Sequence, residues 1–259
     1  LALGLGLLGY GIWGLTGALF LGVAASFIFT HFRLSGIVGG KRGKRPKLKP
    51  LIKYSTATLV QGIALTSMYS TDLILIKHFF SSAEAGIYAS IAILGRIVFF
   101  AGSPVNHVMF PMVARRFYSG ESYMKIFYLS FTLVTLVSIF LLFFYYFFPG
   151  LAINILYGSS YLQGAPLLFW YGIFMALLSL ATLLIQFFLS IGKTRIVLLF
   201  ALAPFLQGIL IWFFHPDLLT VIRMSILIAA LLNLSLFVYF VYLKKLLNEK
   251  TTFSNHPRI

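Results

Sequence analysis

The sequence predicts an all-α integral membrane protein with about seven transmembrane helices. Three observations lead to this fold class. Hydrophobic residues make up 60% of the 259 residues and charged residues only 10%, whereas soluble domains carry about 25% charged residues. The apolar residues form stretches of about 20 residues or more, which is long enough for a helix to cross a bilayer. Most Lys and Arg residues lie between these stretches rather than within them.

Seven regions are apolar enough and long enough to span a membrane. In chain order they are residues 12–32, 51–79, 86–112, 124–148, 166–190, 196–214 and 218–243. The turn sequence GYG at residues 9–11 indicates that residues 1–8 are the end of an earlier helix. The chain begins with Leu1 rather than Met, so we expect it to be a fragment of a longer protein.

The distribution of cations predicts the orientation of these spans. The segment 33–53 holds eight Lys and Arg residues and no acid, and the other cation-bearing segments fall on the same side of the predicted topology. The opposite loops, SSAEAG, PGLAINILYGSSYLQGA and HPDL, contain neither Lys nor Arg. By the positive-inside rule, the basic loop and the C-terminus face the cytoplasm of a multi-pass protein in the cell membrane.

The basic loop has two interpretations. It determines topology and links two parts of the chain, or it recognises anionic lipid headgroups at the inner leaflet. A net charge of +15 in a soluble protein would suggest nucleic acid. Because the cations here lie between membrane spans and no DNA-binding motif accompanies them, we expect no nucleic-acid partner.

Two charged residues lie deep inside predicted spans. Arg96 is about ten residues into its helix, or about 15 Å deep, and Asp72 is roughly 10 Å from the outer end of the preceding helix. An intramembrane charge is costly and marks a candidate functional site. Their helices are consecutive and joined by a short loop, so an Asp72–Arg96 pair is sterically reasonable.

Helical periodicity extends this polar site. Gln61 shares a face of the second span with Asp72, and His107 shares a face of the third span with Arg96. The sequence Gly102-Ser103-Pro104 predicts a kink or an unwound turn in that third span. Two interpretations stay open: a polar cavity on a solute pathway, or a structural pin in which Asp72 and Arg96 neutralise each other.

Catalysis finds little support in the sequence. The five acids are scattered over both faces and the membrane, and the five His residues show no metal-ligand spacing. No nucleophile elbow or phosphate-binding loop is present. We therefore expect a protein that is not an enzyme and binds no metal.

Several motifs resemble one family when they are taken in order. Residues 71–115 contain an Asp before LILIKHFF, then AGIYA, LGR and a final FP, and ILYGSSYLQGAPLL (155–168) and GYGIWGLTGA (9–18) flank them. This part of the chain resembles the seventh and eighth helices of polysaccharide-type flippases. These proteins belong to the multidrug/oligosaccharidyl-lipid/polysaccharide exporter superfamily.

The resemblance implies a fold of two six-helix lobes around a cavity that opens alternately to each side of the membrane. It implies that about five helices of the first lobe precede this chain and act as its partner. It assigns residues 1–32 to the end of the first lobe, 33–50 to a basic cytoplasmic linker, 51–243 to the second lobe and 244–259 to a cytoplasmic tail.

The implied function is the translocation of oligosaccharides linked to a polyprenyl diphosphate, so that membrane lipid and lipid-linked glycan are the expected partners. Arg96 is the candidate for the diphosphate because Arg binds phosphate bidentately; Asp72, His107 and Gln61 complete the expected substrate site. No cofactor is expected, and a coupling ion, H⁺ or Na⁺, is left open. The alternatives are a cation-coupled multidrug antiporter of the same superfamily and a non-transporting scaffold or transferase.

Overall fold

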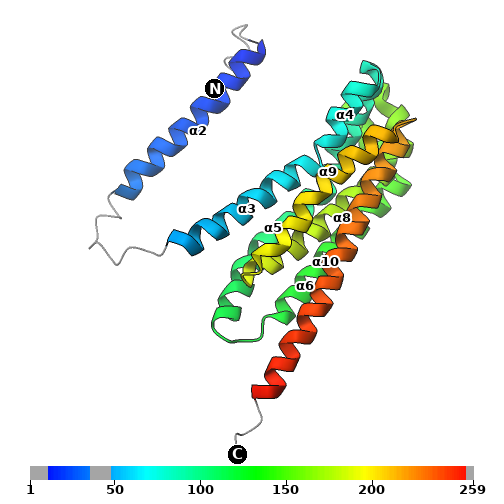
Figure 1. Cartoon of the computed structure of the whole chain (residues 1–259). Coiled ribbons are helices and arrows are strands. Elements are labelled where there is room, and N and C mark those ends of the chain that lie inside the picture. Colours follow the sequence, from blue (N-terminus) through cyan, green and yellow to red (C-terminus); the bar gives the residue numbers. More distant parts are fainter. Residues whose placement is uncertain (1–10, 36–47, 255–259) are drawn as a thin grey trace, which may run out of the picture. The chain divides into compact units, whose positions relative to one another are not determined.

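The computed structural model describes residues 11–35 and 48–254, and every regular element in these two ranges is a helix. The elements are α2 (Gly11–Ser35), α3 (Leu48–Met68), α4 (Thr71–Phe79), α5 (Ser82–Tyr118), α6 (Met124–Phe147), α7 (Pro149–Tyr157), the 3₁₀ helix η1 (Ser159–Gly164), α8 (Ala165–Ser190), the 3₁₀ turn η2 (Thr194–Ile196), α9 (Val197–Phe213) and α10 (Leu218–Ser254) (Figure 1). The predicted all-α class is confirmed.

Seven segments of the described chain are long and apolar enough to cross a membrane, as the sequence predicts. They are Thr16–Leu34, Leu51–Phe79, Ser82–Tyr118, Met124–Phe147, Ser159–Ser190, Thr194–Phe213 and Leu218–Lys245. The protein is therefore a multi-pass integral membrane protein.

The chain divides into two units, Leu1–Leu48 and Lys49–Ile259. The described part of the first unit is the single helix α2, whose large apolar side chains are exposed, with Trp13 at 86% and Phe20 at 78%. A helix with apolar residues on all sides is typical of a membrane span.

Helix α8 is the centre of the second unit and packs against α5, α6 and α10. Most residues along α8 are buried, and apolar and small residues occur on all of its faces. At Gly172 an added Cβ would lie 2.9 Å from Leu142 Cδ2 of α6, which shows how closely the two helices approach. Small residues at such contacts are the usual means by which membrane helices pack.

Polar contacts join helices within this apolar bundle. Gln207 of α9 donates to the hydroxyl of Ser225 on α10 at 2.9 Å, and Asn233 of α10 donates to the carbonyl of Leu177 on α8 at 2.8 Å. Hydrogen bonds of this kind contribute about 0.6 kcal/mol on average between membrane helices.

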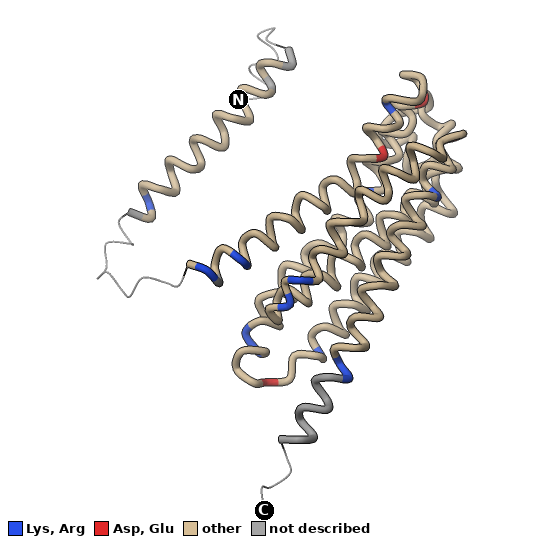
Figure 2. The backbone as a smooth tube through the Cα atoms, viewed as in Figure 1, with Lys and Arg blue, Asp and Glu red and all other residues tan. Residues whose placement is uncertain are grey.

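The charged residues of the second unit lie mainly at the two ends of the bundle (Figure 2). Most of its Lys and Arg residues gather at the end where α3 begins and α5 meets α6. The turns at this end use glycine in the left-handed region, with φ of 74° at Gly120 and 76° at Gly192. At the opposite end, Ser81 and Glu84 form a capping box that begins α5.

Two features differ from the sequence-based expectation. The predicted disruption at Gly102-Ser103-Pro104 is wrong as an unwound turn, because α5 continues through Pro104 and Pro111. The interruption lies in the preceding span, where α3 ends at Met68 and α4 begins at Thr71. Helix α10 continues to Ser254 and so enters the predicted cytoplasmic tail 244–259, whose assignment stays a prediction.

Some predictions fall outside the described residues. These are the earlier helix proposed for residues 1–8, part of the GYG turn, and residues 36–47 of the basic linker. The assignment of residues 1–32 and 51–243 to two lobes stays a prediction.

Candidate functional site

A break between two helices organises the candidate site. Tyr69 and Ser70 separate α3 from α4 within the span Leu51–Phe79. Neither Pro nor Gly occurs here, but Ser67, Ser70 and Thr71 surround the break, and hydroxyl side chains favour helix ends over helix interiors. Backbone bonds from Ser70 N to Ser67 O (3.1 Å) and from Ile74 N to Ser70 O (3.0 Å) close the turn.

Arg96 of α5 binds the end of α3 at this break. Its Nη2 donates a 2.8 Å hydrogen bond to the carbonyl oxygen of Tyr69. Its guanidinium carbon lies 4.9 Å from the centre of the Tyr69 ring. The carboxyl end of a helix carries unpaired carbonyls and partial negative charge, so a cation is stabilising there.

Asp72 lies in the first turn of α4, on the other side of the same break. Its side chain is fully buried. One carboxylate oxygen accepts from the backbone N–H of Leu73 at 2.7 Å, and the other accepts from the hydroxyl of Tyr88 at 2.8 Å. The amino end of a helix favours a negative charge. The two ends of the break therefore each hold a side chain of complementary charge.

Two buried tyrosines surround the carboxylate. The rings of Tyr88 on α5 and Tyr171 on α8 meet edge to face with centroids 5.6 Å apart. The Tyr171 hydroxyl lies beside both Asp72 and Arg96, yet it forms no hydrogen bond of good geometry with the described residues. The Nε of Arg96 is likewise buried and unpartnered among them. The site thus keeps unused hydrogen-bonding capacity next to a cation.

Gly95 explains how Tyr171 reaches this position. A Cβ added at Gly95 would overlap the Tyr171 ring. The glycine directly before Arg96 therefore opens the space through which an aromatic side chain of α8 approaches the charged pair.

Asp72 and Arg96 lie at one helix break, but they do not form the direct ion pair that the sequence suggested. Among the described residues the ion pair within 4.0 Å is Arg116–Glu121, at 3.8 Å near the basic end. Separate partners hold the half-buried Arg96 and the buried Asp72: a carbonyl accepts from Arg96, and a phenol and a backbone amide donate to Asp72. In this conformation Asp72 and Arg96 therefore do not neutralise each other by direct contact.

The structure does not bring His107 and Gln61 to the break. His107 is exposed and its Nδ1 lies 2.9 Å from the carbonyl oxygen of Ser103 in its own helix. It is eleven residues from Arg96, about 16 Å along α5. Gln61 is buried on α3 at 6% exposure, about 12 Å along the helix from Tyr69. Their roles as substrate contacts stay predictions.

Sequence reasoning missed Tyr88, Tyr171 and the carbonyl of Tyr69. Tyr88 lies in the AGIYA motif and is 16 residues after Asp72. Its helical position would put it on the α5 face that approaches α4, because it is two turns before Arg96. No local signal indicates Tyr171, which joins the site from a helix far along the chain.

The comparison with protein families agrees with this architecture. The family model described as polysaccharide biosynthesis protein matches residues 1–166, well over half of the chain. The chain therefore belongs to this family of polysaccharide biosynthesis proteins, as a multi-pass membrane member. Neither a curated protein nor a solved structure matches it significantly.

Proposed function

We propose that the protein is a flippase that moves polyprenyl-diphosphate-linked oligosaccharide across the cell membrane by alternating access. The observation that carries the proposal is the guanidinium of Arg96, held at a helix break inside a membrane span of a polysaccharide biosynthesis protein. A diphosphate crossing the membrane requires such a cation, because an unpaired charge in hydrocarbon is costly.

Arg96 keeps an unpartnered hydrogen-bond donor for a phosphate. A guanidinium has five N–H donors, and one of them donates to Tyr69 O while Nε is unpartnered. Two parallel donors match two phosphate oxygens, which a Lys ammonium cannot reproduce. The hydroxyl of Tyr171 is a further donor beside the same position.

In this proposal Asp72 stabilises the geometry of the helix break. Its bonds to Tyr88 and Leu73 fix the start of α4 against α5. The negative charge also keeps Arg96 at the break when no phosphate is bound. We therefore propose that the protein transports its substrate, with Arg96 as the binding residue, and does not catalyse a reaction.

The orientation follows from the charge distribution. We place the basic end of the bundle in the cytoplasm, by the positive-inside rule. The unit Lys49–Ile259 is then one lobe of the transporter, and alternating access requires a second lobe to move against it. The coupling ion is not specified by this proposal.

A cation-coupled drug antiporter is the second candidate in the same superfamily. Such a transporter needs an acid that a cationic drug can reach. Asp72 is fully buried and both of its oxygens already accept hydrogen bonds. This observation favours the anionic substrate over a cationic drug.

The test is reconstitution of the complete protein in vesicles of bacterial lipid. We expect transfer of a fluorescent polyprenyl-diphosphate oligosaccharide between leaflets, and its loss on Arg96→Gln. Arg223→Gln is the matched control, since Arg223 is exposed and lies 5.6 Å from the Trp170 ring. Transport of a cationic dye without transfer of the lipid-linked glycan would instead support the antiporter.

A further inference from the structure

A charged hollow lies at the basic end of the bundle, where α5 is followed by the turn into α6. It has a volume of about 250 Å³ and is lined by Met112, Arg115, Arg116 and Glu121. Met112 precedes the two arginines by three and four residues, so these three side chains lie on one face of α5. We call this feature the Arg115–Arg116 hollow.

One of the two guanidinium groups is held by the turn. The Nε of Arg116 lies 3.8 Å from Oε2 of Glu121, and its Nη1 donates to the carbonyl oxygen of Ser122 at 3.2 Å. Among the described residues the side chain of Arg115 has neither a hydrogen bond nor an ion pair. The hollow thus sets two positive charges against one negative charge, and the remaining positive charge attracts an anion.

Helix capping does not account for Arg115. Cationic side chains near the end of a helix often hydrogen-bond the last carbonyl groups. In α5 the carbonyls of Arg115 and Arg116 already accept from the backbone N–H groups of Ser119 (3.0 Å) and Glu121 (2.9 Å). The guanidinium of Arg115 is therefore available to a ligand.

The hollow lies at the boundary between membrane and water. The span Ser82–Tyr118 ends three residues after Arg115, about 4.5 Å along the helix. Met112 is 44% exposed and lies about one turn deeper in the span. The hollow thus has an apolar wall toward the membrane and cations at the level of the lipid headgroups. By the positive-inside rule this is the cytoplasmic leaflet, whose anionic lipids attract cations.

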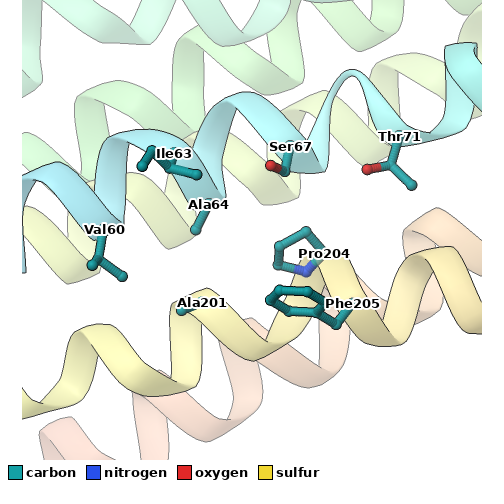
Figure 3. A pocket seen from close by; sticks show the side chains of 8 residues that line it. All are labelled: Val60, Ile63, Ala64, Ser67, Thr71, Ala201, Pro204 and Phe205. Carbon is teal, nitrogen blue, oxygen red and sulfur yellow. The ribbon is translucent and has the colours of Figure 1, made fainter.

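The charge of the hollow selects among possible occupants. The basic segment 33–53 of the chain holds eight Lys and Arg residues and no acid, so like charges disfavour it. The larger hollow between α3 and α9 is a contrast, because its walls are apolar apart from the hydroxyls of Ser67 and Thr71 (Figure 3). A phospholipid matches both walls of the Arg115–Arg116 hollow, since guanidinium groups bind phosphate oxygens in pairs and Met112 offers an apolar contact to an acyl chain.

We propose that the Arg115–Arg116 hollow binds the phosphate of an anionic phospholipid in the cytoplasmic leaflet. Arg115 donates to the phosphate, and Arg116, fixed by Glu121, supplies the second positive charge. Arg115 is 19 residues from Arg96, about 28 Å along α5, so this site is separate from the helix break and does not depend on the proposed transport. The bound lipid ties the end of α5 and its turn to the membrane surface.

The test is photo-crosslinking of the complete protein in vesicles of phosphatidylcholine and phosphatidylglycerol. One variant carries p-benzoylphenylalanine in place of Val108, which is 59% exposed and precedes Met112 by one turn on the same face of α5. The matched control carries it in place of Leu202 of α9, which is 54% exposed. These positions are about 15 Å and 12 Å from the cytoplasmic ends of their spans.

The two probes are phosphatidylglycerol and phosphatidylcholine, each with an alkyne at the end of one acyl chain. We expect phosphatidylglycerol to label position 108 about tenfold more than phosphatidylcholine, and both lipids to label position 202 equally. Arg115→Gln should lower the preference at position 108 about fivefold, equivalent to the loss of about 1 kcal/mol for one cation at the membrane surface. Lys193→Gln removes an exposed cation at the same end and should leave the preference unchanged.

Four results would overturn the proposal: equal labelling of position 108 by both lipids, no effect of Arg115→Gln, an equal loss on Lys193→Gln, or suppression by potassium phosphate but not by potassium chloride of the same ionic strength. An equal loss on Lys193→Gln would indicate diffuse surface charge, and suppression by phosphate would indicate a site for the free ion. Labelling by the phosphatidylcholine probe in each variant reports that the helix is inserted. The readout is lipid binding, so it is independent of transport.

Discussion

The guanidinium of Arg96 lies 2.8 Å from the carbonyl oxygen of Tyr69, so a cation on one membrane helix holds the end of another. Asp72 lies three residues later, in the first turn of the next helix, and accepts a hydrogen bond from Tyr88. An interrupted helix whose two ends carry opposite charges recurs where transporters bind ions or substrates within the membrane. In this protein the Tyr69 carbonyl at the break accepts from Arg96, the residue that we propose binds the phosphate.

The first prediction concerns the buried carboxylate. Asp72→Ala leaves the Tyr88 hydroxyl buried without its acceptor, which costs about 1–3 kcal/mol. Asp72→Asn keeps an acceptor oxygen and should lose less stability. Thermal unfolding of the purified protein in detergent measures both. Asp217→Asn, at an exposed residue, is the control, and equal melting temperatures for Asp72→Ala and the parent protein would contradict the assigned contact.

The second prediction concerns Gly95. Gly95→Ala places a methyl group into the Tyr171 ring, and overpacking of this kind typically costs about 1–3 kcal/mol. At Gly62, where nothing lies within 4 Å of an added Cβ, the same change should stabilise the helix by up to about 1 kcal/mol. The yield of folded protein by size-exclusion chromatography distinguishes the two. If Gly95→Ala folded as well as Gly62→Ala, the close approach of α8 to α5 would be wrong.

The third prediction concerns topology. Reporter fusions at Arg116 and Lys193 should report the cytoplasm, and fusions at Ser82 and Ser159 should report the outside, because the first pair lies at the basic end of the bundle. Alkaline phosphatase and green fluorescent protein fusions give opposite readouts at each site and so control for expression. A cytoplasmic signal at Ser159 would be incompatible with the seven spans.

The fold was largely predictable because membrane spans depend on the length and polarity of local stretches. Each of the seven predicted regions overlaps one observed span. The unwound turn considered at Gly102-Ser103-Pro104 does not form. Helices α6 and α8 pack closely at Gly102, where Val134 and Ser179 lie next to the backbone, and Pro is tolerated within membrane helices.

The candidate site was only partly predictable. The intramembrane position of Asp72 and Arg96 follows from the sequence, since charges in apolar stretches are conspicuous. The hydrogen-bond partners of these two residues could not be predicted. The Tyr69 carbonyl is available only because the helix breaks there, and neither Pro nor Gly in the sequence indicates that break. Tyr171 reaches the site through tertiary packing, from 75 residues after Arg96.

The last prediction separates binding of substrate by Arg96 from a purely structural role. Removing one of the two charges leaves the other inside the membrane span without a nearby opposite charge, which is destabilising. Arg96→Gln alone and Asp72→Asn alone should therefore both lower the abundance of the protein in the membrane. The combined variant removes both charges, and its abundance should recover because the introduced glutamine side chain retains an N–H donor for the Tyr69 carbonyl.

Export of lipid-linked glycan by the complete protein, normalised to membrane abundance, decides between the two roles. If Arg96 binds the diphosphate, the combined Arg96→Gln and Asp72→Asn variant is abundant but does not export. Arg96→Lys should also be impaired, because a point charge cannot reproduce the planar arrangement of donors that binds phosphate. The exposed Lys77, changed to Gln, is the control for loss of a cation near the same helix. Normal export by the abundant double variant would assign Arg96 to architecture, since the break would then need only a neutral donor to the Tyr69 carbonyl.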